Sequence, residues 1–314
     1  MIKILINDGI DPVGLQKLQE FGFDVVTNTV PQDRLSEVLP QYDAICIRSA
    51  TNVRSPLIDL CPNLKAIARG GVGLDNIDVD YAKSKNIAVI NTPAASSRSV
   101  AELAFAHLAS VARFLYKSNR HMPTTGVEEF KALKKSYSKG FELKGKTIGI
   151  IGMGRIGVEC AKLAFGHEMK VIGVDPFVTE KKIDLNLASQ TISIDIPMVS
   201  MDEMLQQADI ITLHVPFTGT PVLSSSEFGK MKKGVIIINA ARGGVVDEVA
   251  LLEALNNDIV AAAGIDVYEN EPNPREELLQ HPNVSCTPHI GANTIEAQKN
   301  IGLELADKLI DVLG

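Results

Sequence analysis

The sequence predicts an α/β protein with two doubly wound parallel sheets in two domains. Short β-rich runs without polar alternation recur roughly every 20 residues, as expected of strands buried on both faces. Segments with helix start signals lie between these runs, and regular alternation of strand and helix implies parallel pairing. A chain of 314 residues with 45% hydrophobic content is long enough for two separate cores.

The first series of strands ends near residue 95. Aspartate or serine followed by proline, at Asp11-Pro12 and Ser55-Pro56, predicts an N-cap with proline in the first helical position. The expected strands are Ile4–Ile6, Val25–Val26, Ala44–Ile47, Ala66–Ala68 and Ala88–Ile90.

Residues 96–115 have apolar side chains near the helical period, which predicts a helix long enough to bridge two domains. The polar, weakly periodic segment 116–144 is interpreted as a boundary region. A second series follows, with capping boxes predicted at Ser200/Glu203 and Ser224/Glu227 and a final helix over 294–313. Its expected strands are Thr147–Ile151, Lys170–Val174, Asp209–Leu213, Val235–Asn239, Ala261–Ile265 and Val284–Cys286.

The composition excludes several classes of function. A net charge of −7 argues against a general binder of nucleic acids or acidic membranes, because such proteins concentrate lysine and arginine. No apolar run approaches the roughly 20 residues of a membrane span, and the N-terminus does not resemble a signal peptide. The four cysteines form neither a disulfide framework nor a zinc pattern, so we expect a cytoplasmic protein without a metal.

A glycine-rich turn between an expected strand and helix predicts a dinucleotide site. The first glycine makes the turn, the second admits a pyrophosphate and the third lets helix and strand pack closely. Asp175 ends the next strand, where a carboxylate accepts ribose hydroxyls and repels a 2′-phosphate, although a strand-end cap would also explain it. We therefore expect NAD rather than NADP, bound at Gly152-Met153-Gly154-Arg155-Ile156-Gly157.

Arg242, Glu271 and His289 each follow one of the last three expected strands, so they can meet at one sheet edge. Oxidation of an alcohol requires a base, and histidine serves near neutral pH. A carboxylate on its other ring nitrogen would orient it, and an arginine fork would bind a substrate carboxylate. The three residue types together indicate hydride transfer, although each alone has an ordinary structural explanation.

These segments resemble the D-isomer-specific 2-hydroxyacid dehydrogenase family over nearly the whole chain, and most closely its phosphoglycerate dehydrogenase branch. The resemblance lies in Arg69-Gly70-Gly71-Val72-Gly73-Leu74-Asp75-Asn76-Ile77-Asp78, Asn91-Thr92-Pro93, Ala241-Arg242-Gly243-Gly244-Val245-Val246-Asp247-Glu248 and Pro288-His289-Ile290-Gly291-Ala292.

The resemblance implies a flavodoxin-like substrate-binding domain of residues 1–95 and 292–314, with a Rossmann-type NAD-binding domain of residues 96–291 inserted into it. It also implies catalysis in a closing cleft and a homodimer formed through the NAD-binding domains. Arg242 would bind the substrate carboxylate and carbonyl, Glu271 would orient the ring, and His289 would be the acid/base. Further cofactor contacts are implied for Asp266, Val215, Pro216, Ala240, Ala241, Gly291 and Ala292, in addition to Arg242 and His289.

By the same resemblance the substrate is 3-phospho-D-glycerate, oxidised to 3-phosphohydroxypyruvate in the first step of L-serine biosynthesis. Arg48 and Arg69 would bind the phosphate, beside Ser49, Gly71, Val72 and Gly73. Two alternatives remain: a glyoxylate or hydroxypyruvate reductase of the same family, and an NAD-sensing transcriptional corepressor. Because the chain stops at Gly314, feedback by serine through a further domain is not expected. The loop after Pro216 is shorter than in the family, so Thr218 and Thr220 receive no role.

Overall fold

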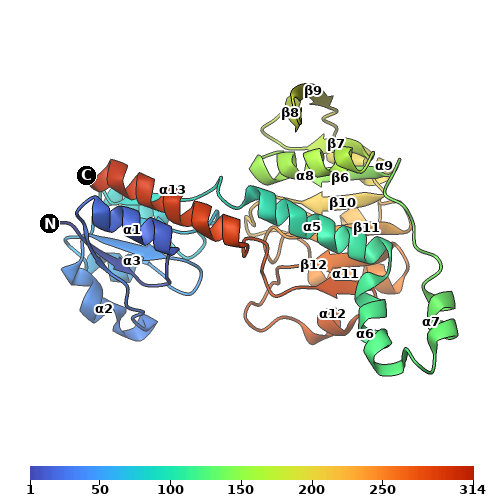
Figure 1. Ribbon diagram of the computed structural model, residues 1–314, viewed down its shortest axis with the longest axis horizontal. Coiled ribbons are helices and arrows are strands. Elements are labelled where there is room, and N and C mark those ends of the chain that lie inside the picture. The colour runs from blue at the N-terminus through green and yellow to red at the C-terminus, as the bar shows by residue number, and fades with distance from the viewer. The chain divides into compact units, whose positions relative to one another are not determined.

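Two groups of residues pack around separate parallel sheets in the computed structural model, which describes all residues from Met1 to Gly314 (Figure 1). Unit 1 consists of Met1–Ser99 and Ala292–Gly314, and unit 2 of Val100–Gly291. The first junction between them lies inside helix α5 (Ser97–Ala112), a few residues beyond the predicted position.

The interpretation of segment 116–144 as a boundary region is wrong. This segment lies inside unit 2, where it forms most of α6 (Leu115–Thr125) and all of α7 (Phe130–Ser136). Its polarity reflects exposure, because α6 has no buried residue. The helix expected over 96–115 stops earlier, since Phe114 adopts a left-handed φ of 54° between α5 and α6.

Unit 1 is built on a five-stranded sheet in the order β2-β1-β3-β4-β5, with all neighbours parallel. This is the flavodoxin-like strand order, and it confirms the predicted fold class. The reversal of direction along the sheet falls between β1 and β3. The strands are β1 (Lys3–Ile6), β2 (Asp24–Val26), β3 (Ala44–Ile47), β4 (Ala66–Arg69) and β5 (Ala88–Asn91).

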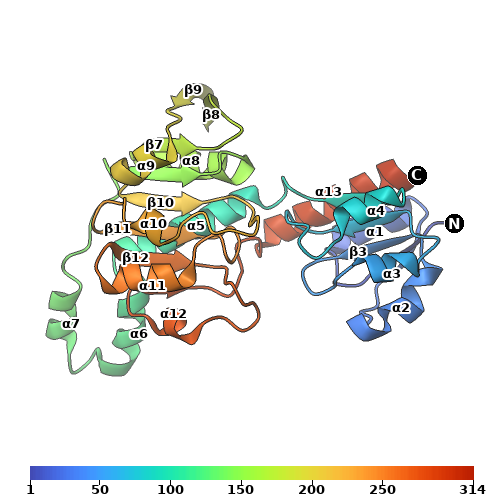
Figure 2. The same cartoon turned by 180° about the vertical axis from the view of Figure 1, so that it is seen from behind.

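Helices cover both faces of the unit 1 sheet. Leu18 of α1 (Pro12–Glu20) and Leu305 of α13 (Ile295–Leu313) share one apolar cluster. The other face packs against α2 (Leu35–Val38), α3 (Ser55–Asp59) and α4 (Val79–Ser84), all visible from behind in Figure 2. None of the helices in the chain is both long and apolar enough to cross a membrane.

Of the two predicted N-caps, one is confirmed and one is wrong. Asp11 caps α1, and its carboxylate accepts a hydrogen bond from the amide of Val13. Ser55 is instead the first helical residue of α3 and follows Arg54 at the cap position. Its amide donates to the carboxylate of Asp78 at 2.7 Å, so a side chain distant in sequence replaces the local cap.

Unit 2 contains a six-stranded parallel sheet in the order β13-β12-β11-β10-β6-β7. One face is covered by α5 and α8 (Arg155–Gly166). The other is covered by α9 (Met201–Gln207), α10 (Ser225–Phe228), α11 (Glu248–Asn256) and α12 (Glu276–Gln280), and both predicted capping boxes are present. The strands are β6 (Thr147–Ile151), β7 (Lys170–Val174), β10 (Ile210–Leu213), β11 (Val235–Asn239), β12 (Val260–Ile265) and β13 (Val284–Cys286).

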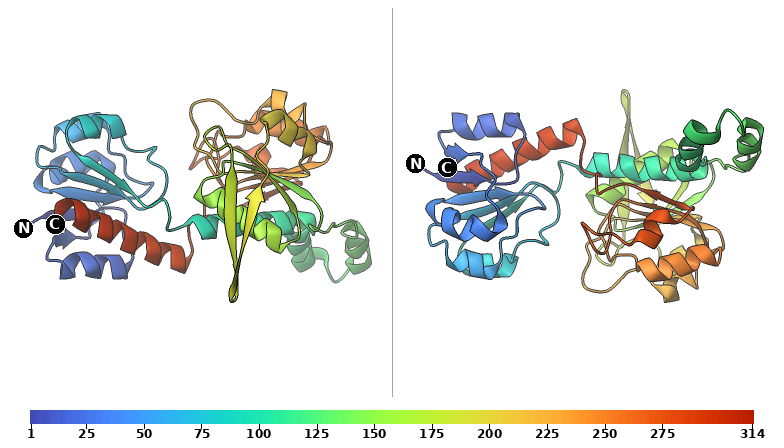
Figure 3. Two further views of the ribbon diagram at one scale, coloured as in Figure 1. Left: turned by 90° about the horizontal axis from the view of Figure 1, so that it is seen from above. Right: turned by 90° about the horizontal axis from the view of Figure 1, so that it is seen from below.

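An antiparallel hairpin that was not predicted interrupts this pattern after β7. Its strands β8 (Lys181–Leu187) and β9 (Gln190–Ile196) form a sheet of their own that extends from unit 2 (Figure 3). Ile183 and Ile196 are buried at the base, whereas Leu187 near the turn is 56% exposed. Its apolar residues alternate with polar ones along both strands, which is the period of a half-exposed strand.

The returning helix α13 packs against α1 through two glycines. A Cβ atom at Gly14 of α1 would lie only 2.4 Å from the carbonyl oxygen of Gly302 on α13. The absence of a side chain therefore allows the two helix backbones to approach closely.

We expect Gly14→Ala to lower the urea midpoint of unfolding. Overpacking costs about 1–3 kcal/mol, and the helix preference of alanine recovers only about 1 kcal/mol. Gln16→Ala on the same helix is the control, and a higher midpoint for Gly14→Ala than for wild type would contradict the close helix contact.

Candidate active site

The loops after β6 and β10 meet where the strand order of unit 2 reverses. These strands are neighbours, although β7, β8 and β9 lie between them in the sequence. In open α/β sheets such a reversal opens a crevice at the carboxyl ends of the strands, where ligands bind. Gly152 follows β6 and Val215 follows β10, and a Cβ at Gly152 would lie 2.7 Å from Cγ1 of Val215.

The three glycines of the turn differ in what they permit. Gly152 has a φ of +93°, and Gly157 packs so closely that a Cβ there would lie 2.0 Å from the carbonyl oxygen of Gly152. Around Gly154, by contrast, a Cβ would meet no atom within 4 Å. Gly154 is the N-cap of α8 and supplies no side chain to the first amides of the helix. This arrangement fits a pyrophosphate above Gly154, close to the amides of Arg155 and Ile156.

Asp175 directly follows β7 and is half-buried. Its Oδ2 accepts from the amide of Met153 and its Oδ1 from that of Phe177, both at 2.9 Å. The carboxylate is therefore attached to the glycine turn. It caps its own loop, which is the ordinary structural role of an aspartate at a strand end.

The loop after β11 holds Arg242. Ala240 and Ala241 are buried, and the side chain of Asn239 donates to the carbonyl oxygen of Arg242 at 3.0 Å. Beside them, Gly243 is required, because a Cβ there would lie 1.8 Å from the carbonyl oxygen of Tyr268. This close approach joins the loop of Arg242 to the loop that carries Glu271.

Glu271 and His289 form a hydrogen-bonded pair. Oε2 of Glu271 lies 2.7 Å from Nδ1 of His289, and Oε1 accepts from the amide of Tyr268 at 2.9 Å. Partial burial raises the pKa of the Glu271 carboxyl, but the hydrogen bonds from His289 and Tyr268 and the positive charges of His289 and Arg242 outweigh it, so the net pKa is lowered. The ionised carboxylate only accepts, which places a proton on Nδ1 and leaves Nε2 for acid/base chemistry.

Asp266 anchors the loop that carries His289. It is 1% exposed, and its carboxylate accepts from the amides of Ile290 and Gly291. Thr287 also donates to it, and His107 of α5 lies behind Thr287. Sequence reasoning missed His107 and Thr287, although a histidine on the apolar face of the predicted helix was a visible signal.

In unit 1, Arg48 and Arg69 lie at neighbouring strand ends. Ile47 of β3 pairs with Arg69 of β4, and a Cβ at Gly70 would lie 3.8 Å from Cγ of Arg48. Arg48 is half-buried and forms no ion pair, whereas Arg69 contacts Asp75 at 3.4 Å. The sequence resemblance did not predict this acidic neighbour of Arg69.

The glycine loop after β4 is fixed by the end of β5. Thr92 accepts from the amide of Gly71 at 2.9 Å, and Asn91 donates to the carbonyl oxygen of Val72 at 2.7 Å. The amides of Val72 and Gly73 have no acceptor within the protein. Ser49, also predicted here, is exposed.

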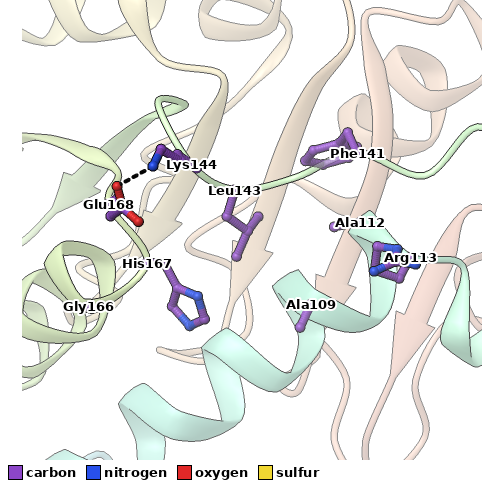
Figure 4. A pocket seen from close by; sticks show the side chains of 9 residues that line it. All are labelled: Ala109, Ala112, Arg113, Phe141, Leu143, Lys144, Gly166, His167 and Glu168. Carbon is purple, nitrogen blue, oxygen red and sulfur yellow. Dashed lines mark ion pairs between the residues drawn. The ribbon is translucent and has the colours of Figure 1, made fainter.

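A surface pocket of about 330 Å³ lies elsewhere in unit 2. Leu143 and Lys144 precede β6, and His167 and Glu168 precede β7, so the pocket lies at the amino-terminal edge of the sheet (Figure 4). The residues predicted to act in catalysis follow strands at the opposite edge, and the pocket takes no part in the site.

Residues 105–291 match the NAD binding domain of the D-isomer specific 2-hydroxyacid dehydrogenase family. A hydroxypyruvate reductase of Thermotoga maritima is 42% identical over 99% of this chain and 98% of its own length. A D-3-phosphoglycerate dehydrogenase of Archaeoglobus fulgidus is 40% identical over 99% of this chain, and the chain spans 57% of that relative's length.

Solved structures agree with these relatives. A glyoxylate reductase from Paecilomyes thermophila has a TM-score of 0.83 and 30% identity, and the match covers 99% of this chain and 94% of that one. The TT0316 protein of Thermus thermophilus has a TM-score of 0.84 and 28% identity, with 99% and 97% covered. The chain therefore belongs to the D-isomer-specific 2-hydroxyacid dehydrogenase family, and it is an NAD-dependent oxidoreductase.

Proposed function

We propose that the protein oxidises 3-phospho-D-glycerate to 3-phosphohydroxypyruvate with NAD and catalyses the reverse reduction. The observation that carries this choice of substrate is the pair of guanidinium groups, Arg48 and Arg69, at adjacent strand ends of unit 1. The free amides of Val72 and Gly73 lie in the loop that follows. Guanidinium groups and unpaired amides are the partners that phosphate and carboxylate require.

NAD fits the glycine turn of unit 2. The open space at Gly154 and the uncapped start of α8 suit the pyrophosphate, and the Asp175 carboxylate suits two ribose hydroxyls. When bound, the nicotinamide supplies the hydride acceptor for C2 of the hydroxy acid.

Side chains of unit 2 transfer the proton and bind the negative charge of the substrate. In the oxidation, Nε2 of His289 takes the proton of the C2 hydroxyl, while the Glu271 carboxylate on Nδ1 fixes the ring and stabilises the imidazolium. Arg242 holds the substrate carboxylate and the C2 oxygen with its planar fork. In the reduction His289 returns the proton to the same oxygen.

Reduction of hydroxypyruvate or glyoxylate is the second candidate. Asp75 contacts Arg69 and would compete with a substrate phosphate for that guanidinium. An unphosphorylated acid needs only the carboxylate contacts, and two of the relatives named above are reductases of this kind.

The protein partner we propose is a second copy of the chain, bound through unit 2. Large apolar side chains on α6, on α7 and between them are exposed to solvent, as in a surface that another protein covers. They are Leu115 (60% exposed), Met122 (45%), Val127 (98%) and Phe130 (57%).

We expect Asp175→Ala to weaken NAD binding and to narrow the preference for NAD over NADP. The change removes the ribose acceptor and the charge that repels a 2′-phosphate. Titration with NADH and with NADPH, followed by the fluorescence of the reduced cofactor, measures both effects, with Asp195→Ala on the hairpin as the control. An unchanged ratio of the two dissociation constants would remove Asp175 from the cofactor site.

We expect His289→Asn to lower kcat by about 10²–10⁴-fold, the contribution of a positioned general acid/base, while NAD binding stays near normal. Glu271→Gln should cost less, about tenfold, because the ring remains. Glutamine cannot stabilise the imidazolium, so the ionisation seen in the kcat/KM profile should move to lower pH. Steady-state rates from pH 5 to 9 measure this, and wild-type turnover in His289→Asn would refute the mechanism.

We expect Arg48→Ala to raise KM for phosphohydroxypyruvate about ten- to a hundredfold more than KM for hydroxypyruvate. Loss of one charge-assisted contact costs roughly 1.5–3 kcal/mol, and only the phosphorylated substrate makes that contact. NADH oxidation with each substrate measures the ratio, and Arg34→Ala on the surface of unit 1 is the control. Equal losses for both substrates would favour the reductase instead.

A further inference from the structure

A hydrogen-bonded series of polar side chains connects α5 to the loop of His289; His107, Ser285 and Asp266 are buried, and Thr287 is half-buried. His107 lies on α5 and is 3% exposed. Its Nδ1 is 3.0 Å from Oγ of Ser285, and its Nε2 is 2.9 Å from Oγ1 of Thr287. Oγ1 of Thr287 in turn lies 2.6 Å from Oδ1 of Asp266. No part of the mechanism above uses His107, Ser285 or Thr287.

The positions of the protons in this hydrogen-bonded series follow from Asp266, its last residue. The Asp266 carboxylate can only accept, so the single hydroxyl proton of Thr287 points to it. Thr287 must then accept from Nε2–H of His107, and Nδ1 of the neutral ring accepts from Ser285. Burial lowers the pKa of His107, although the charge of Asp266 opposes this, and the neutral ring satisfies every donor and acceptor.

Asp266, at the other end of this series, holds the backbone on both sides of His289. The amide of His289 donates to the carbonyl oxygen of Asp266, and the amides of Ile290 and Gly291 donate to its carboxylate. His289 has a φ of 55°, a conformation that non-glycine residues keep only where their surroundings impose it. The Asp266 carboxylate therefore holds the backbone that carries His289, while Glu271 holds the ring itself.

The sheet makes room for His107. A Cβ at Gly264 of β12 would lie 2.5 Å from Cβ of His107. Glycine at this position lets α5 bring the imidazole close to the two hydroxyls at the end of β13. The close contact between Gly264 and Cβ of His107 therefore places the imidazole ring.

We propose that His107 is a positioning residue for His289, acting through Thr287 and Asp266. Nε2–H of His107 occupies the acceptor side of the Thr287 oxygen and so keeps the Thr287 hydroxyl directed at the Asp266 carboxylate. The carboxylate in turn holds the loop that presents the acid/base. The inference rests on the proposed role of His289.

The test combines His107→Leu, Thr287→Val and the double variant, each assayed with NADH and the faster of phosphohydroxypyruvate and hydroxypyruvate. We expect His107→Leu to lower kcat about tenfold, as loss of one hydrogen bond would, with a smaller change in KM. The isotope effect with NADH deuterated at the transferred position should rise. Both changes break the same series of hydrogen bonds from His107 to Asp266. The double variant should therefore be no slower than the slower single variant.

Controls separate positioning from stability. Phe105→Leu removes buried volume from the same helix, so its unfolding midpoint should fall while kcat stays unchanged. His107→Gln keeps a donor for Thr287 and should restore much of kcat. In the wild-type protein, ¹⁵N NMR should find the proton of His107 on Nε2.

Three outcomes would overturn the proposal: wild-type kcat and isotope effect in His107→Leu, additive losses in the double variant, or a proton on Nδ1 of His107. The NMR result stands even if His107→Leu fails to fold. Wild-type turnover in His289→Asn would instead refute the proposed function itself, so the two failures are distinguishable.

Discussion

Parallel pairing of every strand in the two main sheets is the constraint on which the rest of the structure depends. All strands of one sheet end at the same edge, so loops far apart in sequence are brought together there. In unit 2 this edge gathers the glycine turn, Asp175, Arg242 and the pair Glu271/His289. In unit 1 it gathers Arg48 and Arg69. Helices cover both faces of each sheet, so the edge at the carboxyl ends of the strands is the part left to bind ligands.

Much of this could be predicted from the sequence because the signals were local. A strand buried on both faces is a short apolar run, and a turn that needs a φ of +93° at Gly152 needs glycine. Ser55 was misassigned because its real partner, Asp78, is distant in sequence. The ion pair of Arg69 with Asp75 and the chain from His107 to Asp266 depend on side-chain directions that no spacing rule gives.

The hairpin of β8 and β9 was missed for a different reason. Its period of two is present in the sequence, but a doubly wound domain leads one to expect a helix after β7. The buried residues Ile183 and Ile196 connect its base to the core of unit 2. The expectation of a helix after β7 outweighed the alternation of apolar and polar residues, although that alternation alone indicates two strands.

The return of α13 to unit 1 has a consequence for synthesis of the chain on the ribosome. The apolar face shared by Leu18 and Leu305 stays partly uncovered until the residues of α13 have been made. Unit 2 is continuous from Val100 to Gly291, so it is complete before that helix leaves the ribosome. Unit 2 therefore has all of its residues available for folding before unit 1 does, and unit 1 cannot complete its helical cover until α13 is made.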